Sequence, residues 1–263
     1  WGVDSKGNSL NTSSPTEVEM VKVLRGWKDI MMVMAKIAAD YGADNLNIQW
    51  SAFYYPIVTV YSETATQEFI SIIDTVRTIY SGKLFMGTPR FYDKRIIQRV
   101  DAIVIPLVPR GWTTSDDASM SVPNLKQKYI DEITNIYNDF YASSGIPTQD
   151  IPVIWDFNIQ SRDKALSEGW VEDGFCVSSI GGPIVPWGSP NCMQVSYVTD
   201  FSVQAQAIEA AFQAIKEQTR FKTFGVNFST GYWHTDTLIP GPEGFPNLSQ
   251  SIRGKPSEII VRS

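Results

Sequence analysis

The chain has 263 residues, a formal net charge of −6, a pI near 4.9 and 43% hydrophobic residues. This length accommodates one large α/β domain or two small ones, and the apolar content is ordinary for a packed globular core. The acidic balance, without an Arg-rich helix, argues against a nucleic-acid partner. The longest apolar runs, such as residues 30–33, are too short to span a bilayer.

The first half of the chain alternates between helical and extended patterns. Ser14, Pro15 and Glu17 form a capping box with proline at the first helical position. The helix that they start is predicted to stop at Tyr41 and Gly42. The pattern then predicts a strand at 45–50, a helix from about 66 to 82, a strand at 83–87, a short helix at 93–99 and a strand at 101–107.

The second half continues the alternation around one long loop. It predicts a helix at 125–141, a strand at 151–157, a loop at 158–199, a helix at 201–218 capped by Asp200, a strand at 221–228 and a short helix at 257–261. Five strands alternating with helices indicate a parallel sheet with helical crossovers in one domain over residues 1–263. A doubly wound sheet is the alternative, but no Gly-rich phosphate turn follows any strand.

The strand at 151–157 ends in a carboxylate between aromatic rings, Trp155-Asp156-Phe157. In a parallel α/β barrel the C-terminal strand ends form the active face, so this position suits sugar chemistry. Two interpretations of Asp156 remain open. It is either a nucleophile or sugar-binding carboxylate, or it caps a loop and pairs with Arg162.

Cys176 and Cys192 lie in one Gly/Pro-rich stretch. We expect a disulfide that pins this long loop in an oxidising compartment, with two free thiols as the alternative. No His or Asp stands at the spacing of a zinc site, and we expect no metal or cofactor. Sequons at Asn11, Asn227 and Asn247 fit a secreted glycoprotein, although Asn227 falls in a predicted strand.

Several segments together resemble clan A glycoside hydrolases, nearest to the mannanase-like family 113 group. The segment Ala35–Asp44 resembles the helix that precedes the fourth barrel strand in that clan. The other matching segments are 75–82, 100–106, 201–207 and 253–258. The resemblance implies a (β/α)8 barrel of which this chain holds strands four to eight. Strands one to three would then lie before Trp1 or come from another chain.

The resemblance also implies a site, in which this sequence departs from the family pattern. The clan uses Glu residues at the ends of strands four and seven. Here Asp156 stands at the nucleophile position, one methylene short, so its oxygens would fall about 1.5 Å short. Gln49 is the closest match to the acid/base position, and an amide cannot donate a proton as a carboxylic acid does.

The remaining candidate residues would line the binding surface. By the resemblance, Trp233 stands where the clan places an aromatic sugar platform after strand eight. His234, the one histidine in the sequence, either binds a sugar beside it or is a surface or packed residue. Gln49, whose amide can hydrogen-bond a sugar hydroxyl, completes the predicted substrate-binding set together with Trp50 and Trp155.

These observations predict an extracellular glycoside-hydrolase-like barrel that has lost its catalytic pair. It would bind carbohydrate or serve as a structural part of an extracellular assembly. The alternative is an active glycoside hydrolase that cleaves a β-linked polysaccharide such as mannan and uses Asp156 with a relocated acid. A third interpretation is a non-barrel α/β enzyme with a small-molecule site.

Overall fold

The structure is a computed structural model. It describes residues 17–48, 63–87, 94–109, 112, 120–147, 150–157, 159–166, 176–177, 184–185, 199–228 and 252–263. The chain divides into two compact units. Unit 1 comprises residues 1–105, 137–154 and 220–224, and unit 2 comprises residues 106–136, 155–219 and 225–263.

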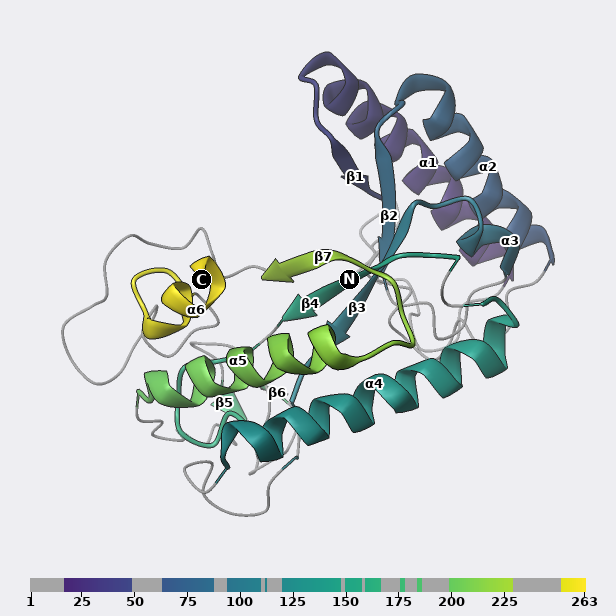
Figure 1. The fold of residues 1–263 in the computed structure, drawn as a ribbon. Coiled ribbons are helices and arrows are strands. Elements are labelled where there is room, and N and C mark those ends of the chain that lie inside the picture. The colour runs from purple at the N-terminus through teal and green to yellow at the C-terminus, as the bar shows by residue number, and fades with distance from the viewer. Residues whose placement is uncertain are drawn as a thin grey trace. The chain divides into compact units, whose positions relative to one another are not determined.

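Five strands form the main sheet, in the order β1-β2-β3-β4-β7 (Figure 1). Their bounds are β1 Asn45–Asn47, β2 Lys83–Gly87, β3 Ala102–Leu107, β4 Val153–Phe157 and β7 Thr223–Phe228. β1 pairs with β2, and β2 with β3, in parallel. The predicted arrangement of five parallel strands joined by helical crossovers is confirmed, and it is that of a partial (β/α)8 barrel.

The described part of the chain contains six helices beside these strands. Their bounds are α1 Glu17–Asp40, α2 Glu63–Ile79, α3 Lys94–Ile97, α4 Val122–Ser144, α5 Phe201–Glu217 and α6 Pro256–Arg262. All of them fall where the sequence predicts a helix. None of the helices in the described part of the chain has the length and hydropathy needed to cross a bilayer.

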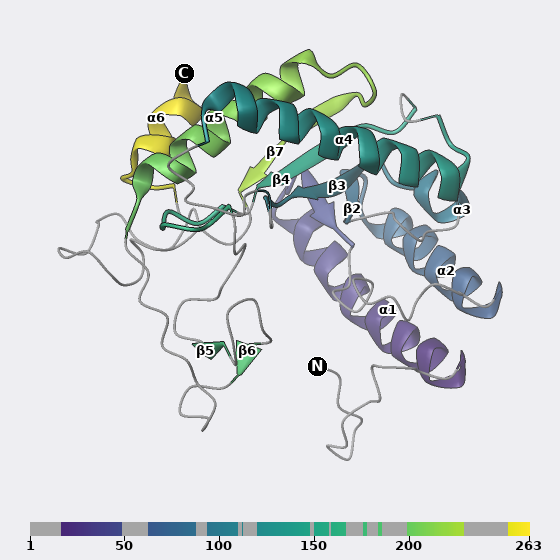
Figure 2. The same cartoon turned by 90° about the horizontal axis from the view of Figure 1, so that it is seen from below.

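Within unit 1, α1 and α2 lie side by side (Figures 1 and 2). The buried stripe of α1 includes Leu24, Met31 and Ala35, at helical spacing. Arg25 of α1 contacts Glu68 of α2 at 2.7 Å. The helix ends where the sequence predicts, because Gly42 takes a φ of +67° that favours glycine.

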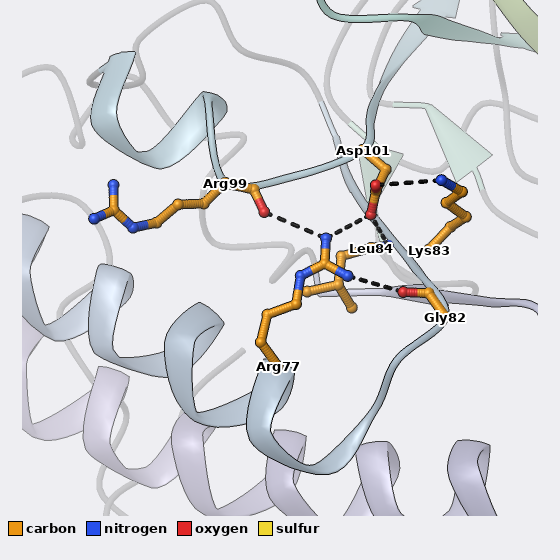
Figure 3. A network of polar contacts seen from close by, with 6 residues as sticks. All are labelled: Arg77, Gly82, Lys83, Leu84, Arg99 and Asp101. Atoms are coloured by element: carbon orange, nitrogen blue, oxygen red, sulfur yellow. Dashed lines mark hydrogen bonds and ion pairs between the residues drawn. The ribbon is translucent and has the colours of Figure 1, made fainter.

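An ion-pair network ties the N-terminal ends of β2 and β3 together within unit 1 (Figure 3). Asp101 accepts from Arg77 Nη2 and, at 2.9 Å, from the backbone N–H of Leu84, while Lys83 Nζ lies 3.6 Å from the same carboxylate. Partial burial, acting alone, would raise the pKa of Asp101. The hydrogen bonds from Arg77 and Leu84, with the positive charges of Arg77 and Lys83, outweigh that effect and hold the pKa below its usual range. The network lies at the N-terminal ends of these strands, where side chains of a barrel contribute to stability rather than to chemistry.

Unit 2 contains α5 and α6, which pack against each other (Figure 2). Asp200 caps α5 as predicted, because its Oδ1 accepts from the backbone N–H of Ser202 at 2.9 Å and of Val203 at 3.4 Å. Pro256 is the first residue of α6, where its missing N–H costs nothing.

The prediction of a structureless loop over residues 158–199 is wrong in part. β5 (Cys176–Val177) and β6 (Ile184–Val185) form a short antiparallel pair, and Arg162 bridges to Thr199. In addition, Ile159, Gln160 and Ser161 are buried. Two-residue strands carry too few side chains for an alternating pattern, which explains why the sequence does not reveal them.

Candidate functional site

Asp156 lies next to the C-terminal end of β4, where the sequence places it. Its Oδ1 accepts a 2.7 Å hydrogen bond from Nδ2 of Asn227, which stands next to the C-terminal end of β7. β4 and β7 are neighbours in the sheet. Among the residues of these two strands, Asp156 is the one carboxylate.

The alternation of side chains along a strand explains this pairing. The rings of Phe157 and Phe228 pack against each other, with centroids 5.4 Å apart, and both contact Phe212 of α5. Neighbouring residues in a strand face opposite sides. Asp156 and Asn227 therefore share the side that faces away from α5.

Trp155 does not share a surface with Asp156. Its side chain is fully buried, at 0% exposure, on the side of β4 that Phe157 also occupies. A ring in this position packs the strand from within the core. The structure thus separates two of the residues that the sequence groups into one site.

A buried polar network holds the segment that follows Asp156. Gln204 Nε2 of α5 donates to the carbonyl of Ile159 at 2.8 Å, and Ser257 Oγ of α6 donates to Oε1 of Gln204 at 2.7 Å. Lys255 Nζ donates to Ser161 Oγ at 2.7 Å, with both side chains nearly inaccessible. The network fixes the exit of β4, and with it the position of Asp156.

No pattern in the sequence indicates a role for the side chains of this network. Gln204, Lys255 and Ser257 lie in the segments 201–207 and 253–258, which stand out in the sequence only by their resemblance to clan A hydrolases. The position of Gln204 inside the apolar stripe of α5 could have indicated the network, because a buried amide needs hydrogen-bond partners. Arg162, the proposed alternative partner of Asp156, is buried and donates to Gln160 Oε1 at 3.1 Å and to the carbonyl of Asp163 at 2.8 Å.

Gln49, Trp50, Trp233, His234 and Cys192 lie outside the described residues, so their predicted roles remain predictions. The same holds for the side chain of Cys176 and for the Cys176–Cys192 disulfide. Ile48, the last described residue before Gln49, donates its N–H to the carbonyl of Phe85 at 2.9 Å. The described residues contain no cluster of three or more His, Cys, Asp or Glu that could hold a metal ion.

The chemistry of the pair is that of a polar binding site. A carboxylate accepts hydrogen bonds, while a side-chain amide both donates and accepts them. Sugar hydroxyls are recognised by such combinations. General acid catalysis of glycoside cleavage requires, in addition, a second carboxyl group about 5 to 9.5 Å away.

The fold is that of a partial (β/α)8 barrel, and Asp156 stands where one of its strands ends. No protein-family model matches the chain, and no curated protein matches it either. Among solved structures, a GH113 β-1,4-mannanase matches over 100% of this chain with a TM-score of 0.53 and 14% identity. A second structure of a GH113 β-1,4-mannanase matches over 100% of this chain with a TM-score of 0.51 and 15% identity.

A third match is a GH113 β-mannanase from Alicyclobacillus acidocaldarius in complex with ManMIm, with a TM-score of 0.48, 16% identity and 90% of this chain covered. The chain covers 65% of the length of the first two mannanases and 60% of the third. The likeness to the first two mannanases, at 14% and 15% identity, establishes the fold alone. It confirms the expected resemblance to GH113 barrels at that level.

Proposed function

We propose that this protein is a glycan-binding barrel whose binding face includes Asp156 and Asn227 at the ends of β4 and β7. The observation that carries the proposal is the 2.7 Å hydrogen bond between the two side chains. In this bond the carboxylate of Asp156 is paired with an amide, whereas a hydrolase of this fold needs a reactive carboxylate at the same position. The structural likeness to mannanases supports a β-linked polysaccharide, such as mannan, as the ligand.

Loss of catalysis follows from the two strand ends taken together. Asp156 is one methylene shorter than the glutamate that the resemblance leads one to expect, and a misplacement of about 1 Å can lower a rate roughly 100-fold. At the other strand end the resemblance offers Gln49, which has no acidic proton to deliver. The protein therefore binds glycan without cleaving it. Trp233 and His234 are proposed to contribute to the same surface.

Binding and hydrolysis of manno- and gluco-oligosaccharides by the purified protein test this proposal. We expect saturable binding by calorimetry, weakened by Asp156→Ala, and no release of reducing ends. Hydrolysis that Asp156→Asn abolishes would establish the alternative, an active glycosidase. A protein that neither binds nor cleaves these sugars would leave only a structural role.

The outer face of α1 favours the presence of a further structural element that packs against it. Ile30, Val33, Met34 and Ile37 are 52%, 60%, 45% and 46% exposed and recur at helical spacing. A contiguous exposed apolar stripe marks an interaction surface. Among the described residues, β1, against which α1 packs, ends the strand order of the sheet.

One occupant satisfies both features, namely a further strand and helix of the same polypeptide. The strand would pair with β1, and the helix would cover the stripe on α1, as the 65% coverage of the mannanases also suggests. To test this, Val33→Glu with Ile37→Glu is compared with Lys22→Glu, at an exposed position of α1 that precedes the stripe. We expect the 263-residue protein to bind a hydrophobic dye, the double variant to bind less, and Lys22→Glu to match the parent.

A longer polypeptide that carries the additional strand and helix should bind little dye in its parent form. A parent chain that binds no dye contradicts the proposal. Light scattering that shows a defined dimer, disrupted by the double variant, would identify a second copy as the occupant instead.

We also propose an extracellular location, which is supported by the spacing of Cys176 and Cys192 and by the sequons. Non-reducing peptide mapping of the protein from its natural source tests it. A disulfide-linked peptide pair is expected, whereas complete alkylation of both thiols without reduction would argue for a reducing compartment.

A further inference from the structure

Asn227 combines two features that conflict. It heads the glycosylation sequon Asn227-Phe228-Ser229, and its side chain donates to Asp156. The nitrogen that donates, Nδ2, is the atom to which N-glycosylation attaches a sugar. Nδ2 of Asn227 is thus both the donor to Asp156 and the atom that glycosylation would modify.

The fold holds Asn227 in its role as hydrogen-bond donor to Asp156. Its neighbour Phe228 packs on Phe157, so β7 cannot rotate about its axis without losing that contact. Alternation then directs Asn227 to the side where Asp156 stands. Hydrogen bonds to a charged acceptor are about twice as strong as those between neutral groups.

We propose that Asn227 is the positioning residue for the Asp156 carboxylate, and that its sequon stays unmodified in the binding-competent protein. The proposal rests on the glycan-binding function above. The amide fixes the carboxylate in one orientation, in which it meets a sugar hydroxyl. A covalent glycan on Nδ2 would remove one of the two donor hydrogens and would stand over the strand end where the ligand arrives.

Four variants expressed in cells that glycosylate sequons separate these roles. Ser229→Ala removes the sequon and keeps Asn227, so we expect unchanged affinity for the oligosaccharide that the parent binds. Asn227→Ala removes the donor and should weaken binding about tenfold or more. Asn227→Asp should weaken it at least as much, because it places a second negative charge beside Asp156. Asn227→Gln keeps the amide but misplaces it, and should also lose affinity.

Mass spectrometry of the peptide that contains residue 227 completes the test. We expect no glycan at this position in protein that binds oligosaccharide. A glycan found there in the binding fraction overturns the proposal, as does unchanged affinity of Asn227→Ala. Thermal unfolding of each variant verifies that the fold persists.

The pairing can also be tested without any glycan. In NMR spectra the side-chain amide signals of Asn227 should shift in Asp156→Ala, and their protons should exchange faster with solvent. If these signals do not change, the positioning role is refuted whatever the binding assays give. If they change while the parent binds no oligosaccharide, the glycan-binding function fails and the pairing stands.

Discussion

The hydroxyl of Ser257 donates a 2.7 Å hydrogen bond to Oε1 of Gln204, and both side chains are fully buried. The bond joins α6 to α5, while Nε2 of the same glutamine holds the carbonyl of Ile159. The amide of Gln204 thus connects both helices to the segment that leaves β4. The NH2 group of this amide has an acceptor as its partner, and its oxygen has a donor.

Ser257→Ala should lower the free energy of unfolding by about 1–3 kcal/mol, because it removes a donor from a buried acceptor. Urea denaturation followed by circular dichroism measures the change. Ser263→Ala is the matched control: its hydroxyl donates to the carbonyl of Ile260 at an exposed position. The control should change stability by less than about 0.5 kcal/mol. Equal effects of the two substitutions would contradict the network.

Asp200→Ala should destabilise the protein by about 1 kcal/mol, because the first N–H groups of α5 lose their acceptor. Asp200→Asn and Asp200→Ser keep an acceptor oxygen and should retain most of the stability. The midpoint of thermal unfolding is the measurement. If Asp200→Asn were as unstable as the alanine variant, the carboxylate charge rather than capping would be responsible.

The contribution of Asp101 to stability should depend on pH. Its pKa in the folded protein is depressed, so its stabilising effect is present above the pKa of the unfolded chain, about 3.9. The effect is lost as the pH falls through the lower folded pKa. The stability difference between the parent and Asp101→Asn should therefore be constant near neutral pH and shrink below about pH 4. Because the site is partly exposed, we expect a difference of at most about 1 kcal/mol.

Denaturation of both proteins between neutral pH and pH 3 checks this expectation. Asp74→Asn serves as the control, since that carboxylate pairs with Arg99 at an exposed position, 3.3 Å away. A stability difference for Asp101→Asn that grew as the pH fell would have the wrong sign for a depressed pKa.

Two glycines should respond in opposite ways to replacement by alanine. A Cβ at Gly82 would collide with the buried ring of Tyr80 and come within 2.8 Å of the carbonyl of Asp44, so Gly82→Ala should be destabilising. A Cβ at Gly26, inside α1, would meet nothing within 4 Å. Gly26→Ala should stabilise the protein by roughly 0.5–1 kcal/mol through helix propensity. Parallel urea titrations compare the two, and a stabilised Gly82→Ala would contradict the packing around Tyr80.

Much of the fold follows from local patterns. The strand 83–87 and the capping of α5 by Asp200 are read directly from neighbouring residues, because alternation and capping act over a few positions. α4 extends three residues beyond each predicted end, over Val122–Ser144. Helix ends depend on packing as well as on propensity, which limits their prediction from sequence.

The candidate site could be predicted from the sequence only in part. The sequence predicts that Asp156 stands at a strand end, and pairing with Arg162 was one of two interpretations. The structure supplies Asn227, 71 residues away, which the sequence marked only as a sequon. That contact requires β7 to lie next to β4 in one particular register, and neither condition is encoded within either strand alone.

Sequence patterns alone were thus enough to predict the helices, the five strands of the main sheet and the carboxylate where β4 ends, but not β5 and β6. Only the tertiary structure decided that Trp155 faces the core, that Asn227 faces Asp156, and that Gln204 and Ser257 hold the segment between β4 and α5. The physical reason is range. Secondary structure responds to periodicity over a few residues, whereas a site is assembled from strand ends and helix faces that folding alone brings within hydrogen-bonding distance.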